Sequence, residues 1–184
     1  MSKSALVILA PGAEEMEFVI SADVLRRAEV KVTVAGLGST DPVKCSRDVM
    51  IVPDVTLAEA AKQEFDAVVM PGGLGGAKVL AESKEVGELL KKQEQSGKII
   101  AAICAGPTAL KAHSIGLGKS LTSYPSVKDQ LASSYKYIDD QTCVQDGTLI
   151  TSRGPGTAYE FALKIAENLV GEAKTQAVRK AMLL

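Results

Sequence analysis

Apolar runs of strand length alternate with stretches of helical period throughout this chain of 184 residues. The first four runs consist mostly of Val, Ile, Leu and Ala at successive positions, as expected of strands that are covered on both faces. This alternation predicts an α/β fold with a largely parallel sheet flanked by helices. We expect the main strands at residues 5–10, 31–36, 65–70, 98–103, 120–123 and 148–152.

Three further signals add detail to this pattern. Short extended pieces at residues 42–53 predict a small side hairpin. Two Thr and Glu pairs have the spacing of a capping box and predict helix starts: Thr56 with Glu59, and Thr157 with Glu160. A terminal helix is expected from Glu172 onward, and it has one apolar stripe that packs either on the body or on a partner. The stripe consists of Ala177, Ala181 and Leu184.

Composition favours one domain over residues 1–184, because a chain with 46% hydrophobic residues can bury one substantial core at this length. A net charge of -1, a pI near 5.9 and the lack of a long basic run exclude the electrostatic footprint of a dedicated nucleic-acid or membrane-surface binder. The N-terminal apolar run at residues 5–10 is too short for a signal peptide or a membrane span. We therefore expect small molecules or proteins as partners.

The three cysteines are odd in number and widely spaced, so they do not form a disulfide framework and they suit a reducing compartment. We expect an intracellular protein. Cys45 and Cys143 have neither a sharp turn nor a helix start beside them, and we interpret them as inert thiols. Secondary redox reactivity is the alternative for Cys45, because Arg47 is close to it in sequence.

Four glycine-rich or polar segments follow the ends of predicted strands. Their sequences are PGAEEME, PGGLGG, CAGPT and RGPGT. Open parallel sheets bind their ligands beyond the carboxyl ends of the strands, so these segments should surround one cleft if their strands are neighbours.

Cys104 ends the apolar strand KIIAAI and is followed at once by Ala-Gly-Pro-Thr. Ala102 and Gly106, two positions before and after it, are small, as the sharp turn of a nucleophile elbow requires. Pro107 then suits the first turn of a helix. A thiolate at such a turn gains from free amides and from the helix dipole, which predicts a low pKa and high reactivity. The alternative is a buried, inert cysteine.

Glu17 is the predicted acid partner of this thiol. At about 100° per residue it lies on one helical stripe with Ile20 and Val24, whereas Glu15 falls on a more polar side. Burial would raise the pKa of Glu17, and a protonated carboxyl group can donate a hydrogen bond to a thiolate and shuttle a proton. The alternative for Glu17 is an acid that only complements the helix dipole, and this is our interpretation of Glu14 and Glu15.

Gly72 and Gly73 follow the third main strand at the same cleft, and together with the amide of Ala105 they could supply an oxyanion hole. Pure turn chemistry is the alternative for both glycines. PGGLGG lacks the Lys and hydroxyl residue of a phosphate loop. The residues therefore predict no nucleotide cofactor.

His113 is the one histidine of the chain, on the helix that Cys104 opens. Nine residues of helix place it roughly 13 Å along and about half a turn away from Cys104. Cysteine proteases and amidotransferases need an imidazole beside the thiol, so this class is disfavoured. A lone histidine with scattered cysteines also predicts no metal site.

Six motifs make the chain resemble the ThiJ/PfpI superfamily, and within it the Parkinson-disease-associated deglycase branch, over essentially its whole length. They are ALVILAPGAEEME, KVTVAGL, CSRDV, VVMPGG, AAICAGPTAL and TSRGPGT. The resemblance implies a flavodoxin-like three-layer sandwich, an obligate homodimer, and a Cys104 that is easily oxidised to a sulfinic acid held by Glu17. It also implies a cytoprotective, chaperone-like role in oxidative stress, in cytoplasm, mitochondria and nucleus.

The resemblance carries a second, enzymatic reading. Many relatives convert glyoxal and methylglyoxal, or early glycation adducts, to hydroxy acids without a cofactor. Members of the branch often have a histidine in the segment SYPSVKD, where this chain has Tyr124, and a phenol does not act as a base near neutral pH. Arg47, Gly154 and Pro155 match family segments near the pocket and are predicted to line it.

Two functional hypotheses follow from these residues. The leading one is a redox-responsive protein in which Cys104 is a low-pKa thiolate that is oxidised stepwise to sulfinate, with protonated Glu17 as donor. The alternative is a glyoxalase or deglycase that forms a hemithioacetal on Cys104. A purely structural or chaperone protein is a further reading, in which the thiol has no role.

Overall fold

A seven-stranded sheet in the order β10-β11-β7-β6-β1-β2-β5 forms the centre of this computed structural model, which describes residues 2–184. Six strands are parallel, and β10 pairs antiparallel with β11 at one edge. The strands are β1 Ser4–Leu9, β2 Lys31–Gly36, β5 Val55–Thr56, β6 Ala67–Met70, β7 Ile99–Ile103, β10 Cys143–Asp146 and β11 Leu149–Ser152. The mostly parallel sheet is thereby confirmed.

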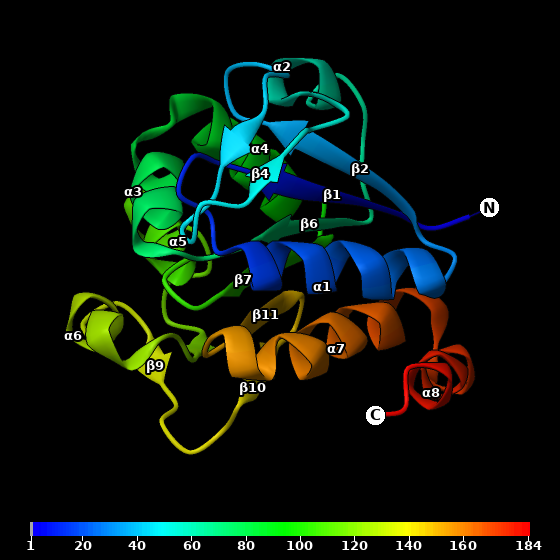
Figure 1. Ribbon diagram of the computed structural model, residues 1–184. Coiled ribbons are helices and arrows are strands. Elements are labelled where there is room, and N and C mark those ends of the chain that lie inside the picture. Colours follow the sequence, from blue (N-terminus) through cyan, green and yellow to red (C-terminus); the bar gives the residue numbers. More distant parts are fainter. Residues whose placement is uncertain (1) are drawn as a thin grey trace.

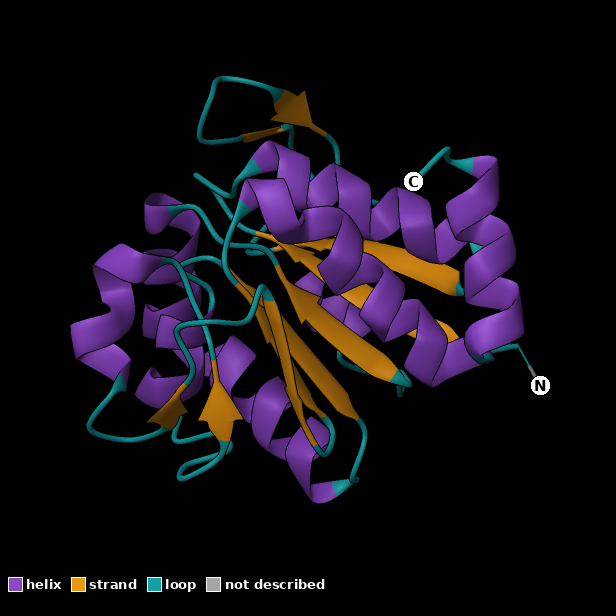
Figure 2. Ribbon diagram, turned by 90° about the horizontal axis from the view of Figure 1, so that it is seen from below, coloured by secondary structure: helices purple, strands orange, loops and turns teal. Residues whose placement is uncertain are grey.

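Helices cover both faces of the sheet (Figures 1 and 2). On one side α1 packs against α7, and α7 against α8. On the other side α3 packs against α5, and α4 against β7. The helices are α1 Glu15–Arg27, α2 Leu57–Ala60, α3 Leu74–Glu82, α4 Lys84–Gln95, α5 Pro107–Ala112, α6 Lys128–Leu131, α7 Ala158–Val170 and α8 Glu172–Ala181.

The central strands are apolar at successive positions because both of their faces are covered. All four residues of β6 and four of the five residues of β7 are buried. Five of the six expected strands lie in this sheet, with ends that differ from the expectation by at most two residues.

The strand expected at residues 120–123 is wrong as a member of the main sheet. Ser120–Leu121 forms β8, which pairs with β9 Lys136–Tyr137 in a separate two-stranded sheet. The edge of β11 is taken instead by β10, because the two-residue turn at residues 147–148 lets β10 and β11 pair as a hairpin. β11 therefore pairs with the strand next to it in sequence, and residues 120–121 pair with β9.

The side hairpin is confirmed, with β3 Val43–Lys44 antiparallel to β4 Met50–Ile51 (Figure 1). The capping hydroxyl of Thr56 is also confirmed, since it accepts from the Glu59 amide at 3.2 Å. The second capping box is wrong. The Thr157 hydroxyl accepts instead from the amides of Arg153 and Gly154, which precede it. The carboxylate of Glu160, its predicted capping partner, accepts instead from the Thr142 hydroxyl.

The terminal helix α8 is confirmed, but it packs on α7 through a different stripe from the expected one. Thr175 and Val178 are the buried residues of α8. The expected stripe is exposed, and its members are Ala177, Ala181 and Leu184. Within residues 2–184 no helix combines the length and the apolar character needed to cross a membrane.

Candidate functional site

Strands β11, β7, β6 and β1 are neighbours and parallel, so the four segments that follow their carboxyl ends meet at one edge of the sheet, as predicted. A cavity of about 460 Å³ opens there. Its lining comes from all four segments, from the β3–β4 hairpin and from the segment after β8. The lining residues are Gly12, Glu14, Ser46, Arg47, Gly73, Leu74, Gly75, Cys104, Tyr124 and Pro155.

Cys104 occupies the predicted elbow between β7 and α5. Its φ of 63° lies in the left-handed region, which costs a non-glycine residue on the order of 1–3 kcal/mol. Two backbone hydrogen bonds hold the turn: the Cys104 amide donates to the Ser152 carbonyl at 3.0 Å, and the Tyr124 amide donates to the Cys104 carbonyl at 2.8 Å. A Cβ at Gly106 would lie only 2.9 Å from the Ile103 carbonyl oxygen, which explains the small residue there.

Gly72 packs closely against Cys104 and donates a hydrogen bond to Glu17. A Cβ at Gly72 would lie 2.5 Å from the Cβ of Cys104, so only glycine fits. The Gly72 amide donates to Oε2 of Glu17 at 2.7 Å. Gly72 therefore positions the acid, and its amide is not free for the oxyanion hole predicted from the sequence. The amides of Gly73 and Ala105 do act on the sulfur of Cys104, since both lower the pKa of the thiol.

Glu17 is fully buried, as the apolar stripe predicted. Burial raises its pKa to about 7, against the opposing effects of the Gly72 amide and the Cys104 thiol, and the charge of Glu14 raises it further. The second oxygen, Oε1, is buried without a hydrogen-bond donor among residues 2–184. The carboxyl group thus changes its protonation state near neutral pH, beside the thiol.

The predicted low pKa of Cys104 is wrong for this structure. Burial raises the pKa of the thiol to about 12, and the negative charge of Glu17 adds to the effect, while the amides of Gly73 and Ala105 lower it. The elbow was predictable, but the depth of burial and the charge beside the sulfur outweigh the backbone donors. Since the charge of Glu17 raises the pKa of Cys104, while the thiol lowers the pKa of Glu17, Cys104 and Glu17 titrate as a pair.

Tyr124, Pro155 and Arg47 all line the cavity, as predicted from the matching segments. Gly154 supports this wall, because a Cβ there would lie 3.4 Å from Cδ2 of Tyr124. The structure brings the predicted site residues together around Cys104. Their chemical roles stay predictions.

Glu15 was assigned wrongly as an acid that only complements the helix dipole. Its side chain is buried, and it accepts hydrogen bonds from the Ser46 hydroxyl at 2.8 Å and the Arg47 amide at 2.7 Å. The apolar stripe of α1 shows only which residues pack on the sheet. Glu15 lies on another side of α1, which the β3–β4 hairpin covers. Glu14 is the N-cap of α1, as the expected helix-start acid, and accepts from the Glu17 amide at 2.8 Å.

Known proteins share both the sequence and the fold of this chain. The family model described as DJ-1/PfpI family matches residues 3–168. The chain belongs to the DJ-1/PfpI family. It is 66% identical to protein dj-1beta of Drosophila melanogaster over 184 residues, which are 100% of this chain and 98% of that protein. The crystal structure of Drosophila melanogaster DJ-1beta superposes with a TM-score of 0.99 and covers 100% of this chain and 99% of that chain.

Two other DJ-1 relatives bear names that concern function or disease. The Parkinson disease protein 7 homolog of Danio rerio is 54% identical over 99% of this chain and 97% of its own length. The glutathione-independent glyoxalase DJR-1.2 of Caenorhabditis elegans is 49% identical over 99% of this chain and 97% of its own length. The resemblance inferred from the six motifs is thereby confirmed.

The remaining thiols and the histidine lie outside this DJ-1/PfpI cleft. Burial raises the pKa of Cys45 to about 11 and that of Cys143 to about 12, with nearby carboxylates adding to both. His113 is the C-cap of α5, with Nε2 2.9 Å from the Leu80 carbonyl oxygen. In the described part of the chain, no three His, Cys, Asp or Glu side chains gather as metal ligands.

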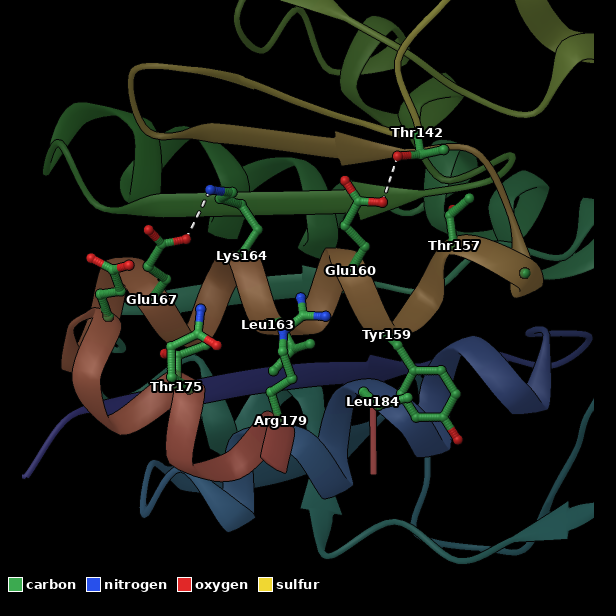
Figure 3. Close-up of a pocket in the computed structure, with 13 residues that line it drawn as sticks. Thr142, Thr157, Tyr159, Glu160, Leu163, Lys164, Glu167, Thr175, Arg179 and Leu184 are labelled. Carbon is green, nitrogen blue, oxygen red and sulfur yellow. Dashed lines mark hydrogen bonds and ion pairs between the residues drawn. The ribbon is translucent and has the colours of Figure 1, made fainter. Parts of the chain in front are cut away.

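A second cavity of about 500 Å³ lies between α7 and α8, away from Cys104 (Figure 3). Several of its charged and polar side chains already pair with each other: Lys164 with Glu167, and Glu160 with Thr142. None of the predicted site residues lines it. We therefore place the candidate chemistry of this DJ-1/PfpI protein at the Cys104 cleft.

Proposed function

We propose that this chain is a redox-responsive, cytoprotective protein of the oxidative-stress response, with Cys104 as oxidisable nucleophile and Glu17 as its proton partner. One observation carries the proposal: the buried thiol lies beside the Glu17 carboxyl group, and the amides of Gly73 and Ala105 favour an anion at its sulfur. A sulfinate carries a negative charge on two oxygens, so it gains more from these donors than the neutral thiol does.

Oxidation of Cys104 takes two steps, and each consumes one hydrogen peroxide. Glu17 accepts the thiol proton, the sulfur attacks one peroxide oxygen, and the O–O bond breaks to give sulfenic acid and water. A second peroxide oxidises the sulfenic acid in the same way, giving sulfinate and another water. A pKa of about 7 suits Glu17 to accept a proton and to return it near neutral pH.

Intact-mass analysis after mild peroxide treatment tests this proposal. We expect two added oxygen atoms that map to Cys104, and a sharp fall of this product in Glu17→Gln. Cys45→Ser and Cys143→Ser are the matched controls and should leave the uptake unchanged, because both thiols lie outside the cleft. Oxidation spread evenly over the three cysteines would overturn the proposal.

A second candidate function is the conversion of small α-oxoaldehydes, or of early glycation adducts, to hydroxy acids. The cavity of about 460 Å³ beside Cys104 favours it, because a small aldehyde can approach the thiol there. The glyoxalase name of the worm relative, at 49% identity, is further support.

In this reaction the Cys104 thiol adds to the aldehyde carbon and forms a hemithioacetal. Glu17 removes the proton from that carbon and returns it to the neighbouring carbon, which leaves a thioester of the hydroxy acid. Water then hydrolyses the thioester and restores the thiol. One substrate and one water give one product, and no cofactor is consumed.

Lactate formation from methylglyoxal tests the enzymatic reading. We expect activity in the wild type and its loss in Cys104→Ser and Glu17→Gln. We also expect Tyr124→His to raise the turnover, because an imidazole can act as a base near neutral pH whereas the phenol cannot. Activity that survives in Cys104→Ser would exclude the covalent route.

We also propose that the protein is a homodimer, as the family resemblance implies. Exposed apolar side chains gather on α1 and the hairpin, including Met16, Val19, Met50 and Val52. Val19 and Val52 line one shared surface cavity, so the two elements form a continuous face. Light scattering should give a dimer mass for the wild type and a smaller mass for Met50→Asp. Leu117→Asp is the control, since Leu117 is equally exposed elsewhere.

A further inference from the structure

Glu15 is a buried acid that neither proposed reaction uses. It lies in the first turn of α1, two residues before Glu17, and only 6% of it is exposed. Two residues turn a helix by about 200°, so the two carboxyl groups point to nearly opposite sides of α1. Glu17 reaches Gly72 and the thiol, whereas Glu15 reaches the tip of the β3–β4 hairpin.

The hairpin tip occupies both oxygens of Glu15. Oε1 accepts from the Arg47 amide at 2.7 Å, and Oε2 accepts from the Ser46 hydroxyl at 2.8 Å. Burial by itself raises the pKa of Glu15, but these bonds, together with the amides of Glu15 and Val49, lower it. The ionised carboxylate is therefore the form that binds the tip.

This carboxylate matters because it is the acceptor of the Arg47 amide, whereas the other bonds within the tip join the residues around it: the Cys45 amide donates to the Val49 carbonyl, and the Asp48 amide to the Cys45 carbonyl. Strands β3 and β4 have two residues each, and a two-stranded hairpin is marginally stable in water. Two backbone bonds also tie the hairpin to the segment before α1: the Ser46 amide donates to the Ala13 carbonyl, and the Gly12 amide to the Lys44 carbonyl. Neither of them involves the amide of Arg47.

The same tip forms one wall of the Cys104 cleft. Ser46 and Arg47 both line the cavity, and Arg47 is the one cation among the described residues that line it. The Arg47 guanidinium also folds back onto the tip, since Nη1 donates to the Ser46 carbonyl at 3.1 Å. Where the tip lies therefore decides where this positive charge lies relative to the thiol.

We propose that Glu15 is a positioning residue that holds Arg47 at the cleft and thereby makes the site prefer anionic over neutral reagents. The inference goes beyond the proposed chemistry at Cys104, because the reagents named there, hydrogen peroxide and methylglyoxal, are neutral. It names the substrate class that the site favours: small electrophiles that carry a carboxylate or another negative group.

Alkylation of Cys104 by two reagents of similar size tests the proposal. The rate constant for iodoacetate, which is anionic, is divided by that for iodoacetamide, which is neutral, at one pH. The modified residue is identified by peptide mass analysis. The thiolate displaces iodide from both reagents, so the thiolate fraction cancels and the ratio of the two rate constants reports the preference for charge.

We expect Glu15→Gln to lower this ratio by about threefold, the size of a solvent-exposed charge interaction. Arg47→Ala should lower it as much, and Glu15→Gln added to Arg47→Ala should change nothing more. Glu85→Gln is the matched control, because Glu85 is a partly exposed acid in the first turn of α4, outside the cleft, and should leave the ratio unchanged. Glu15→Asp keeps the charge but is too short for both donors, so an intermediate fall is expected.

The sign of the effect separates positioning from simple electrostatics. Glu15→Gln removes a negative charge, so Coulomb attraction alone would raise the ratio. A rise, an unchanged ratio, or an equal fall on the Arg47→Ala background would overturn the proposal. Alkylation needs neither peroxide nor turnover. A falling ratio in a protein whose Cys104 resists peroxide and whose methylglyoxal activity is absent would therefore keep this inference and reject the proposed functions.

Discussion

Replacing Glu17 by Gln should change how the stability of the protein depends on pH. Burial raises the pKa of Glu17 from 4.5 to about 7, so between these values the folded state binds more protons than the unfolded state. Stability from this group is therefore fully present below pH 4.5 and is lost as the pH rises through about 7. The whole loss is about 3 kcal/mol, and about 2.5 kcal/mol of it falls between pH 5 and pH 8.

Urea unfolding at pH 5, 6, 7 and 8, at one protein concentration and with reductant present, measures this effect. The side-chain amide introduced by Glu17→Gln can still accept from the Gly72 amide but does not titrate. The free energy of unfolding of Glu17→Gln, relative to the wild type, should therefore rise by about 2.5 kcal/mol from pH 5 to pH 8. The assay stays below the range in which the thiol of Cys104 loses its proton.

Glu15→Gln is the internal control for this experiment, because the pKa of Glu15 is lowered and its stabilising effect depends on pH in the opposite direction. Burial opposes ionisation of Glu15 as well, but the hydrogen bonds from its own amide, Ser46, Arg47 and Val49 lower its pKa. Its stabilising effect is present above the unfolded pKa and is lost as the pH falls. A difference between Glu17→Gln and the wild type that stays flat from pH 5 to 8 would show that Glu17 does not titrate near neutral pH, and would refute the reasoning.

Three other changes test separate parts of the site. Gly72→Ala places a Cβ 2.5 Å from that of Cys104 and should cost about 1–3 kcal/mol in urea unfolding, whereas Gly156→Ala meets nothing within 4 Å and should be neutral. The alkylation rate of Cys104 should still rise above pH 9 in the wild type and shift to lower pH in Glu17→Gln; a plateau near pH 6 would contradict the raised pKa. Thr157→Val removes the acceptor of two amides and should cost about 1–3 kcal/mol in the same unfolding assay.

The sequence predicted the fold well where each apolar run is covered on both faces, as in β6 and β7. It failed at β8, because no pattern within residues 120–123 shows that β10 already occupies the edge of β11. The elbow at Cys104 was predictable for a local reason: small neighbours and a following proline are all it requires. The single domain and the cellular location stay predictions.

The site was less predictable where it depends on contacts between distant segments. The helical period identified Glu17 as buried, but the same period placed Glu15 on a polar side, since the hairpin that covers it is about 30 residues away in sequence. The prediction of a low pKa for Cys104 failed for a similar reason. Its sign is decided by burial and by the charge of Glu17, and neither can be seen in the residues next to the cysteine.

A raised thiol pKa does not argue against a reactive Cys104; it changes where the reactivity comes from. The charge of Glu17 contributes to the high pKa, and that contribution disappears when the thiol proton moves onto Glu17. The amides of Gly73 and Ala105 remain, and they favour an anion at the sulfur. A sulfinate stays charged at neutral pH, so it keeps Glu17 protonated and uses all three donors at once. In the proposed function, the site therefore stabilises the oxidised product more than the resting thiol.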